Sequence, residues 1–178
     1  FRSHIVCAAI NKEVAAYYLN LLKKLNLNAS VLDVSTFANL NLLLSNDEHK
    51  DPLSVLIDLS SSFIEISILI NRNLEFSRSI SITEQDYNET FLNPENQEKK
   101  HQVIAEKITQ TLVEEIKNAL GSCRNIDESK SVDTVFISGG GHLTSHLTST
   151  LELAAGVQVF KLQSPETINT TASSNFST

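Results

Sequence analysis

The 178-residue chain is 41% hydrophobic and carries a formal net charge of −7 at pH 7. This length and apolar content suffice for one globular domain or two small ones. Acidic residues gather between positions 84 and 115, and Lys and Arg form no extended run, so nucleic acids and anionic membranes are poor partners. No apolar stretch reaches the roughly 20 residues that a membrane-spanning helix requires.

The cysteines and histidines show no pattern typical of a metal or disulfide site. Cys7 lies in an apolar, strand-like run and Cys123 follows a glycine, which is neither a disulfide framework nor a metal spacing. His142 and His146 are four residues apart, but no third ligand accompanies them, so we predict no metal site. No Gly-x-Ser-x-Gly elbow of a hydrolase is present. The chain contains no Met, and we expect it to be part of a longer polypeptide.

The first 50 residues predict the order strand, helix, strand, helix. An apolar run at 5–10 ends at Asn11, an acceptable helix N-cap, and apolar residues at helical spacing from 14 to 25 predict an amphipathic helix with a buried face. Residues 31–34 predict a second short strand, after which Ser35 caps a helix that runs to Leu44. The polar stretch 45–52 is the expected domain boundary.

Three consecutive strands are predicted next, at 53–59, 63–70 and 74–82. All three are rich in Val, Ile or Leu, and in the second strand isoleucines alternate with other residues, which is the period of a strand. Short turns connect the strands, so we expect an antiparallel meander.

The second half predicts a long helix followed by a strand, a helix and a strand. The polar stretch 83–98 shows no regular pattern, and apolar residues recur every four positions from 104 to 120, with Gly121 expected at the C′ position. A strand at 132–138, a helix at 143–153 and a strand at 157–162 follow. The tail beyond 164 is expected to fray. The predicted class is therefore α/β, with a mixed sheet and flanking helices.

A carboxylate and a serine cluster, Asp58 with residues 60–62, stand at the turn between the first two strands of the meander. A turn of this kind can present backbone N–H groups to a phosphate, with the aspartate near a bound cation. Close backbone approach to a phosphate favours glycine, and none is present here. A plain hairpin turn closed by serine hydroxyls is the alternative, and both interpretations stay open.

The triple glycine Gly139, Gly140 and Gly141 lies between a predicted strand and a predicted helix. Such a junction lets a ligand lie against the backbone, and the helix N-terminus beyond it offers free N–H groups. Neither the separated glycines of a dinucleotide fingerprint nor the Lys-Ser/Thr ending of a P-loop is present. A requirement for backbone shape alone is an equally adequate explanation.

Several segments, in the order in which they occur, resemble the actin-like ATPases of the PilM and FtsA type: 56–69, 74–80, 135–141 and 156–159. In that family a strand ending in Asp-Ile-Gly opens the second phosphate loop, a hairpin returns through Phe-x-Arg-x-Ile, and a glycine-rich adenosine motif follows. The resemblance implies a partial actin-like (ribonuclease H-like) fold. It divides the chain into 1–50, the end of an inserted small subdomain and the return into the first large domain; 51–165, the second actin-like domain; and 166–178, a frayed or truncated tail.

The resemblance also implies where a nucleotide would bind. Adenosine would contact Gly139, Gly140 and Gly141, and its phosphates would contact Asp58, Ser60 and Ser61. Ser60, however, stands where the family has the phosphate-loop glycine, and Phe63 and Ile64 replace hydroxyl-bearing residues. We therefore expect a degenerate nucleotide site, no catalytic residues and no required cofactor, while binding of ATP and magnesium by a full-length protein stays open.

The likeness is as close to the actin-like cytoplasmic part of type II secretion platform proteins, which has the fold without the nucleotide chemistry. It implies a non-enzymatic, cytoplasmic scaffold at the inner face of the inner membrane, in type IV pilus assembly or type II secretion. Such a scaffold binds the short N-terminal peptide of an inner-membrane partner and can form homo-oligomers. The alternatives are an ATP-binding actin-like ATPase, an FtsA-type cell-division filament protein and an unrelated α/β domain.

Overall fold

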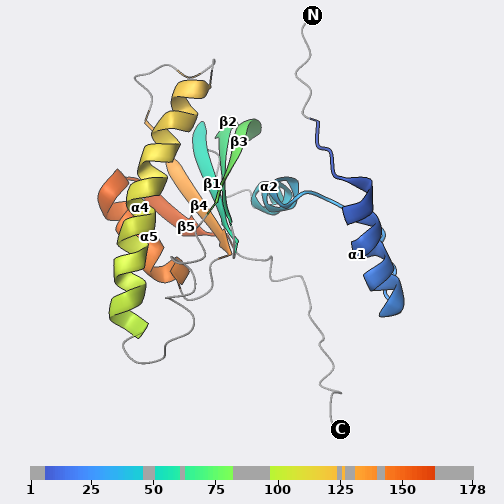
Figure 1. Cartoon of the computed structure of the whole chain (residues 1–178). Coiled ribbons are helices and arrows are strands. Elements are labelled where there is room, and N and C mark those ends of the chain that lie inside the picture. The colour runs from blue at the N-terminus through green and yellow to red at the C-terminus, as the bar shows by residue number, and fades with distance from the viewer. Residues whose placement is uncertain are drawn as a thin grey trace, which may run out of the picture.

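The computed structural model describes residues 7–45, 51–60, 63–81, 97–123, 126, 131–139 and 143–162. Its helices and strands follow one another in an α/β order (Figure 1). They are α1 (Lys12–Lys24), α2 (Ser35–Ser45), β1 (Leu53–Leu59), β2 (Phe63–Ile70), β3 (Asn73–Ser81), α4 (Gln97–Ser122), β4 (Thr134–Gly139), α5 (Leu143–Ala155) and β5 (Gln158–Lys161).

The strands form one five-stranded mixed sheet in the order β3-β2-β1-β4-β5. β1 pairs antiparallel with β2, and β2 with β3, which confirms the predicted meander. β4 adds parallel to β1, and β5 parallel to β4, with α5 as the connection between the last two strands. The carboxyl ends of β1 and β4 therefore meet at one edge of the sheet.

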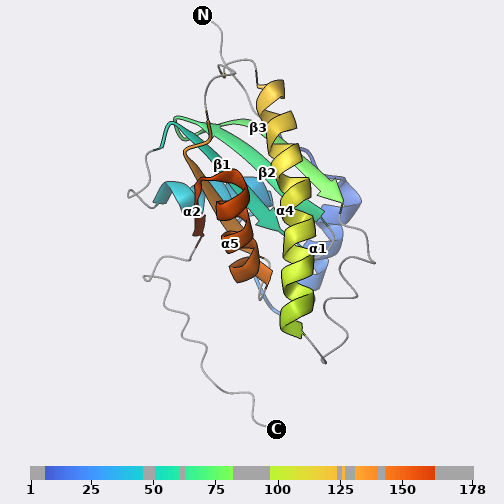
Figure 2. The same ribbon diagram turned by 90° about the vertical axis from the view of Figure 1, so that its left-hand side faces the viewer.

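Helices cover both faces of the sheet, as Figures 1 and 2 show: α4 and α5 lie on one face and α2 on the other. The larger core lies under α4 and α5, where Ile57, Ile137 and Leu112 are fully buried. A smaller core under α2 contains Leu43, Leu56 and Phe136. Because both faces of β1 are covered, its sequence is a nearly continuous apolar run rather than an alternating one.

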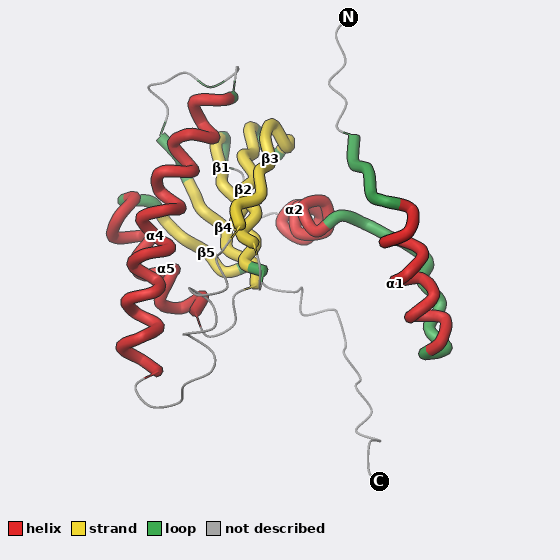
Figure 3. Tube along the Cα trace, viewed as in Figure 1, coloured by secondary structure: helices red, strands yellow, loops and turns green. Residues whose placement is uncertain are grey.

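Helix α1 forms as predicted, but the expectation that it buries one face is wrong. The Asn11 side chain accepts a hydrogen bond from the backbone N–H of Glu13 at 2.8 Å, which confirms the N-cap. No residue of α1 is buried, and in Figures 1 and 3 the helix stands clear of the sheet, with α2 between them. Amphipathic spacing indicates that a helix can bury a face, and burial itself requires a neighbouring surface.

The two strands predicted before α2 are not observed where the structure describes them. Residues 7–10 and 31–34 have no strand structure, while residues 5 and 6 lie outside the described ranges. A strand is defined by hydrogen bonds to a neighbour, and the described part of the five-stranded sheet pairs with neither segment. Their apolar, β-branched composition alone therefore did not suffice to make them strands.

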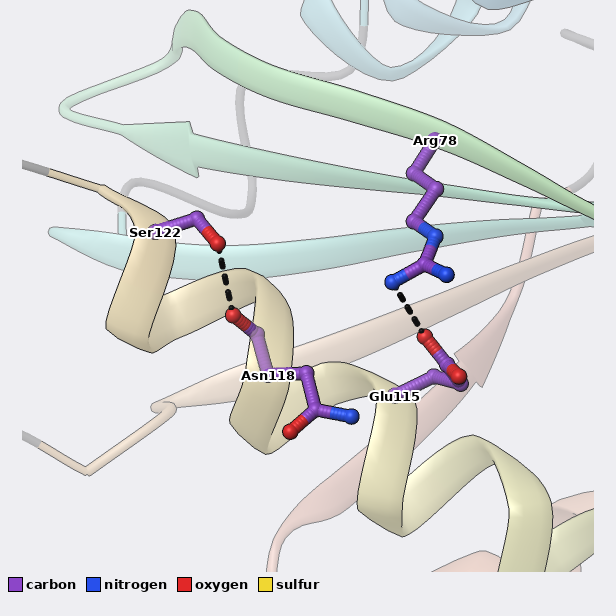
Figure 4. A network of polar contacts seen from close by, with 4 residues as sticks. All are labelled: Arg78, Glu115, Asn118 and Ser122. Atoms are coloured by element: carbon purple, nitrogen blue, oxygen red, sulfur yellow. Dashed lines mark hydrogen bonds and ion pairs between the residues drawn. The ribbon is translucent and has the colours of Figure 1, made fainter.

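Two predicted helix ends also differ. Gly121 is not at C′, because α4 continues through it to Ser122. Ser122 Oγ donates to the Asn118 carbonyl at 2.9 Å (Figure 4) and Cys123 Sγ to the Ala119 carbonyl at 3.3 Å. These two side chains donate hydrogen bonds to carbonyls of the last turn. In many helices those carbonyls accept instead from backbone N–H groups at a left-handed glycine. Ser35 is the first residue of α2, and its hydroxyl bonds Glu65 instead of capping the helix.

Other expectations fall outside the described ranges, namely most of the linker at 45–52, most of the polar stretch at 83–98, and the tail beyond 164. Within the described ranges, no helix combines the length and apolar character needed to cross a membrane.

Candidate functional site

A row of polar side chains crosses the sheet on the side of α2. Ser138 of β4 is the register partner of Asp58 in β1, and Asp58 is the partner of Glu65 in β2. Helix α2 lies over this row, and its Ser35, Thr36 and Asn39 supply the side chains that bond it. The sequence predicted Asp58 as a site residue, and the structure adds Asn39, Ser138 and Glu65 around it.

Asp58 lies at the carboxyl end of β1, beside the carboxyl end of the parallel strand β4. Ligands of α/β proteins commonly bind at this edge of a sheet. Ser138 Oγ donates to Asn39 Oδ1 at 3.0 Å, and both side chains lie within hydrogen-bonding reach of the Asp58 carboxylate. Burial raises the pKa of Asp58; the Ser138 bond lowers it, the charge of Glu65 raises it and the Asn39 bond lowers it.

The hydrogen bonding between β1 and β2 continues one residue beyond their last register pair, on both sides of the connection. The Ser60 N–H donates to the Phe63 carbonyl at 3.0 Å, next to the pair formed by Leu59 and Ile64. The Ser60 amide is therefore already hydrogen bonded within the chain. Ser61 and Ser62 lie outside the described residues.

Gly139 has a role in chain packing. Its φ is +75°, and a Cβ at this position would lie 2.4 Å from the Leu59 carbonyl oxygen. Its own carbonyl accepts a hydrogen bond from Thr144 Oγ1 at 2.6 Å. The close approach of β1 and β4 therefore requires glycine here, while Gly140 and Gly141 lie outside the described residues.

Thr144 was not identified from the sequence, although it is almost fully buried. It lies in the first turn of α5, and its hydroxyl bonds this turn to the last residue of β4, Gly139. The sequence signal that could have identified Thr144 is a hydroxyl-bearing residue shortly after a glycine-rich junction.

Glu65 is the second residue that sequence reasoning missed. Its carboxylate accepts hydrogen bonds from Ser35 Oγ at 2.9 Å, from Ser77 Oγ at 3.0 Å and from Thr36 Oγ1. A cavity of about 230 Å³ lies beside it, between β3 and the segments around Cys7 and Val34. The signal was a lone carboxylate among isoleucines in a central strand, where a charge requires partners.

The described residues contain no group of three or more His, Cys, Asp or Glu side chains that could hold a metal ion. The carboxylates of Asp58 and Glu65 can accept hydrogen bonds from a bound molecule, and the Ser138 hydroxyl can donate or accept one, at this edge of the sheet.

No protein-family model and no curated protein sequence matches the chain. Solved structures do match. A structure described as a PilM-PilN type IV pilus biogenesis complex has a TM-score of 0.62 at 22% identity, covering 85% of this chain and 48% of that one. The ethanolamine utilization protein EutJ from Carboxydothermus hydrogenoformans has a TM-score of 0.56 at 13% identity, covering 86% and 57%.

A Bacteroides thetaiotaomicron protein with an actin-like ATPase fold and unknown function matches at a TM-score of 0.49 and 12% identity, covering 85% of this chain and 46% of that one. The chain thus spans about half the length of these structures. At sequence identities of 22% and 13%, the structural similarity shows a shared fold. The mixed sheet with helices on both faces is accordingly a partial actin-like fold, of the kind found in the PilM-PilN structure.

Proposed function

We propose that the chain is part of a cytoplasmic scaffold with an actin-like fold, acting at the inner-membrane platform of a type IV pilus or type II secretion system and lacking ATPase activity. The observation that carries this proposal is the hydrogen bond from the Ser60 N–H to the Phe63 carbonyl, which occupies the N–H group at the end of β1. A phosphate cradle needs free N–H groups at this position, and glycine to let the phosphate approach them.

Gly139 supports the same proposal. The space in front of its Cα is filled by the Leu59 carbonyl of the neighbouring strand, so this glycine is accounted for by strand packing without a ligand. The nucleotide contacts implied for Ser61, Gly140 and Gly141 belong to the ATP-binding alternative, and they stay predictions. The division into 1–50, 51–165 and 166–178 is part of the scaffold proposal.

The proposed partner is the short cytoplasmic N-terminal peptide of an inner-membrane platform protein. The similarity to a PilM-PilN complex supports a function in binding another protein. Exposed apolar side chains along α1, among them Val14, Tyr18 and Leu21, support it as well, since such a stripe is typical of an interface.

The test is isothermal titration of the protein with ATP and magnesium, beside the Ser60→Gly and Ser60→Ala variants. We expect no binding by the unmodified protein. Binding gained by Ser60→Gly and not by Ser60→Ala would identify the missing glycine as the cause, whereas tight, magnesium-dependent binding by the unmodified protein would contradict the scaffold.

An ATP-binding actin-like protein is the second candidate, and the position of Asp58 favours it. This carboxylate lies at the carboxyl ends of two parallel strands, and among the described residues no ion pair joins it to a cation. If this candidate is right, Asp58→Asn abolishes the magnesium dependence of ATP binding. The nucleotide affinity without magnesium then changes little.

A further inference from the structure

Helix α2 is fastened to the sheet at both of its ends. At its first turn, Ser35 and Thr36 donate to the Glu65 carboxylate of β2. At its last turn, Arg72 Nη2 donates to the Leu44 carbonyl at 2.7 Å. Arg72 reaches this carbonyl from the β2–β3 turn, where Asn71 and Arg72 both have positive φ. Leu40 and Leu43, in the second half of the helix, pack onto the smaller core.

The described part of the chain before α2 is exposed, although Cys7 and Ala8 line the pocket that Glu65 and β3 also line. No residue described between 7 and 34 is buried, and the helix within it, α1, stands clear of the sheet (Figure 1). The placement of this part therefore depends largely on where α2 points as it leaves the sheet.

We propose that the Glu65 carboxylate, through its hydrogen bonds to Ser35 and Thr36, holds the first turn of α2 in place and thereby sets the orientation of residues 7–34 relative to the sheet. We call these contacts the clasp. Helix α2 is then the last element that the sheet holds directly, and the boundary of the sheet unit lies before α2 rather than at the polar stretch 45–52. This inference does not depend on the proposed scaffold function. It assigns α2 to the unit that contains the sheet.

The chemistry of the clasp suits this role. A carboxylate at a helix N-terminus complements the helix dipole, and hydrogen bonds to a charged acceptor are stronger than neutral ones. Thr36 is buried, with 6% of its surface exposed, so its hydroxyl depends on Glu65 for a partner. Removing the charge weakens the bonds to Ser35, Thr36 and Ser77 together.

The clasp also adjoins the candidate site. Asn39 lies one turn further along α2 and contacts Ser138 at the end of β4. A ligand that binds at Asp58 and displaces Asn39 would therefore act on the helix that the clasp holds.

The experiment compares Glu65→Gln with the unmodified protein by hydrogen exchange and by a distance measurement. Spin labels are placed at Asn20→Cys on α1 and Gln110→Cys on α4, both exposed positions, after both native cysteines are changed to serine. We expect Glu65→Gln to broaden the distance distribution and to speed exchange of the Ala38 amide, which is hydrogen bonded to the Val34 carbonyl, by about tenfold, because the charged hydrogen bonds that hold this end of α2 are weakened.

Thr109→Val is the matched control. It removes the 2.6 Å hydrogen bond between Thr109 and Thr150, which joins α4 to α5 on the other face of the sheet. The control is expected to lower the melting temperature without broadening the distance distribution. Unchanged distances and exchange in Glu65→Gln would overturn the proposal, and so would equal broadening in Thr109→Val, because general loosening would then explain both.

Discussion

Gly139 and Leu59 lie at the same level of two parallel strands, so close that a Cβ on Gly139 would stand 2.4 Å from the Leu59 carbonyl oxygen. Two penalties therefore oppose any side chain at this position: the overlap, and the positive φ of +75°. We expect Gly139→Ala to destabilise the fold by about 3 kcal/mol, measured by urea unfolding.

Two other glycines provide controls for this prediction. Gly156 has a φ of +66° and open space around it. Gly156→Ala is therefore expected to lower the unfolding free energy by only about 1–2 kcal/mol, the cost of placing an alanine in the left-handed conformation. Gly121 lies inside α4 with nothing within 4 Å, and Gly121→Ala should stabilise by roughly 0.5–1 kcal/mol. If Gly139→Ala costs no more than Gly156→Ala, the overlap is relieved by strand movement and the packing argument fails.

Arg78 and Glu115 form an ion pair between β3 and α4, at 2.8 Å (Figure 4). The Arg78 side chain is 49% exposed, so water and salt screen the pair from that side, while the Glu115 side chain is 20% exposed and its pairing oxygen Oε2 is buried. A double-mutant cycle with Arg78→Ala and Glu115→Ala should give a coupling of about 0.2–1 kcal/mol. The coupling should shrink in 1 M salt, and one that persists there would indicate a buried contact instead.

Asp58 should make stability depend on pH, because burial raises its pKa above the ordinary value. A raised pKa in the folded state means that the group's stabilising contribution is present below the unfolded pKa of 3.8 and is lost as the pH rises through the folded pKa. Asp58→Asn should therefore raise the melting temperature at pH 7 and lose this advantage near pH 3. Glu114→Gln, which removes an exposed carboxylate from α4, controls for net charge.

The apolar stripe of α1 should contribute little to the stability of the chain. Leu21 is 42% exposed, whereas Leu112 of α4 is fully buried at 0%. We expect Leu21→Ala to change the unfolding free energy by less than about 0.5 kcal/mol and Leu112→Ala to reduce it by about 2–5 kcal/mol. A large loss from Leu21→Ala, measured by denaturant titration, would mean that α1 packs against the rest of the molecule in solution.

Part of the candidate site could be predicted from the sequence. Asp58 was identified because a carboxylate and, two residues later, a run of serines stand between two apolar strands, and Gly139 because glycines cluster between a strand and a helix. Asn39 and Ser138 could not be identified, because nothing in the sequence indicates that α2 crosses the sheet above β4. For the same reason, the sequence does not indicate that Ser35 and Thr36, 30 and 29 positions away in the chain, supply hydroxyls to Glu65.

By itself, the sequence determined the meander, the long helix and the final strand, helix and strand, because period-two and period-four apolar spacing acts within one element. Only the tertiary structure decided which of the segments with a strand-like or amphipathic pattern pair with another strand or pack against a surface. Residues 31–34 and the stripe of α1 have strand-like and amphipathic patterns, yet within the described ranges the first pairs with no strand and the second covers no surface. Hydrogen bonding and burial are relations between segments, so a local pattern indicates the capacity for them but not the neighbour that fulfils it.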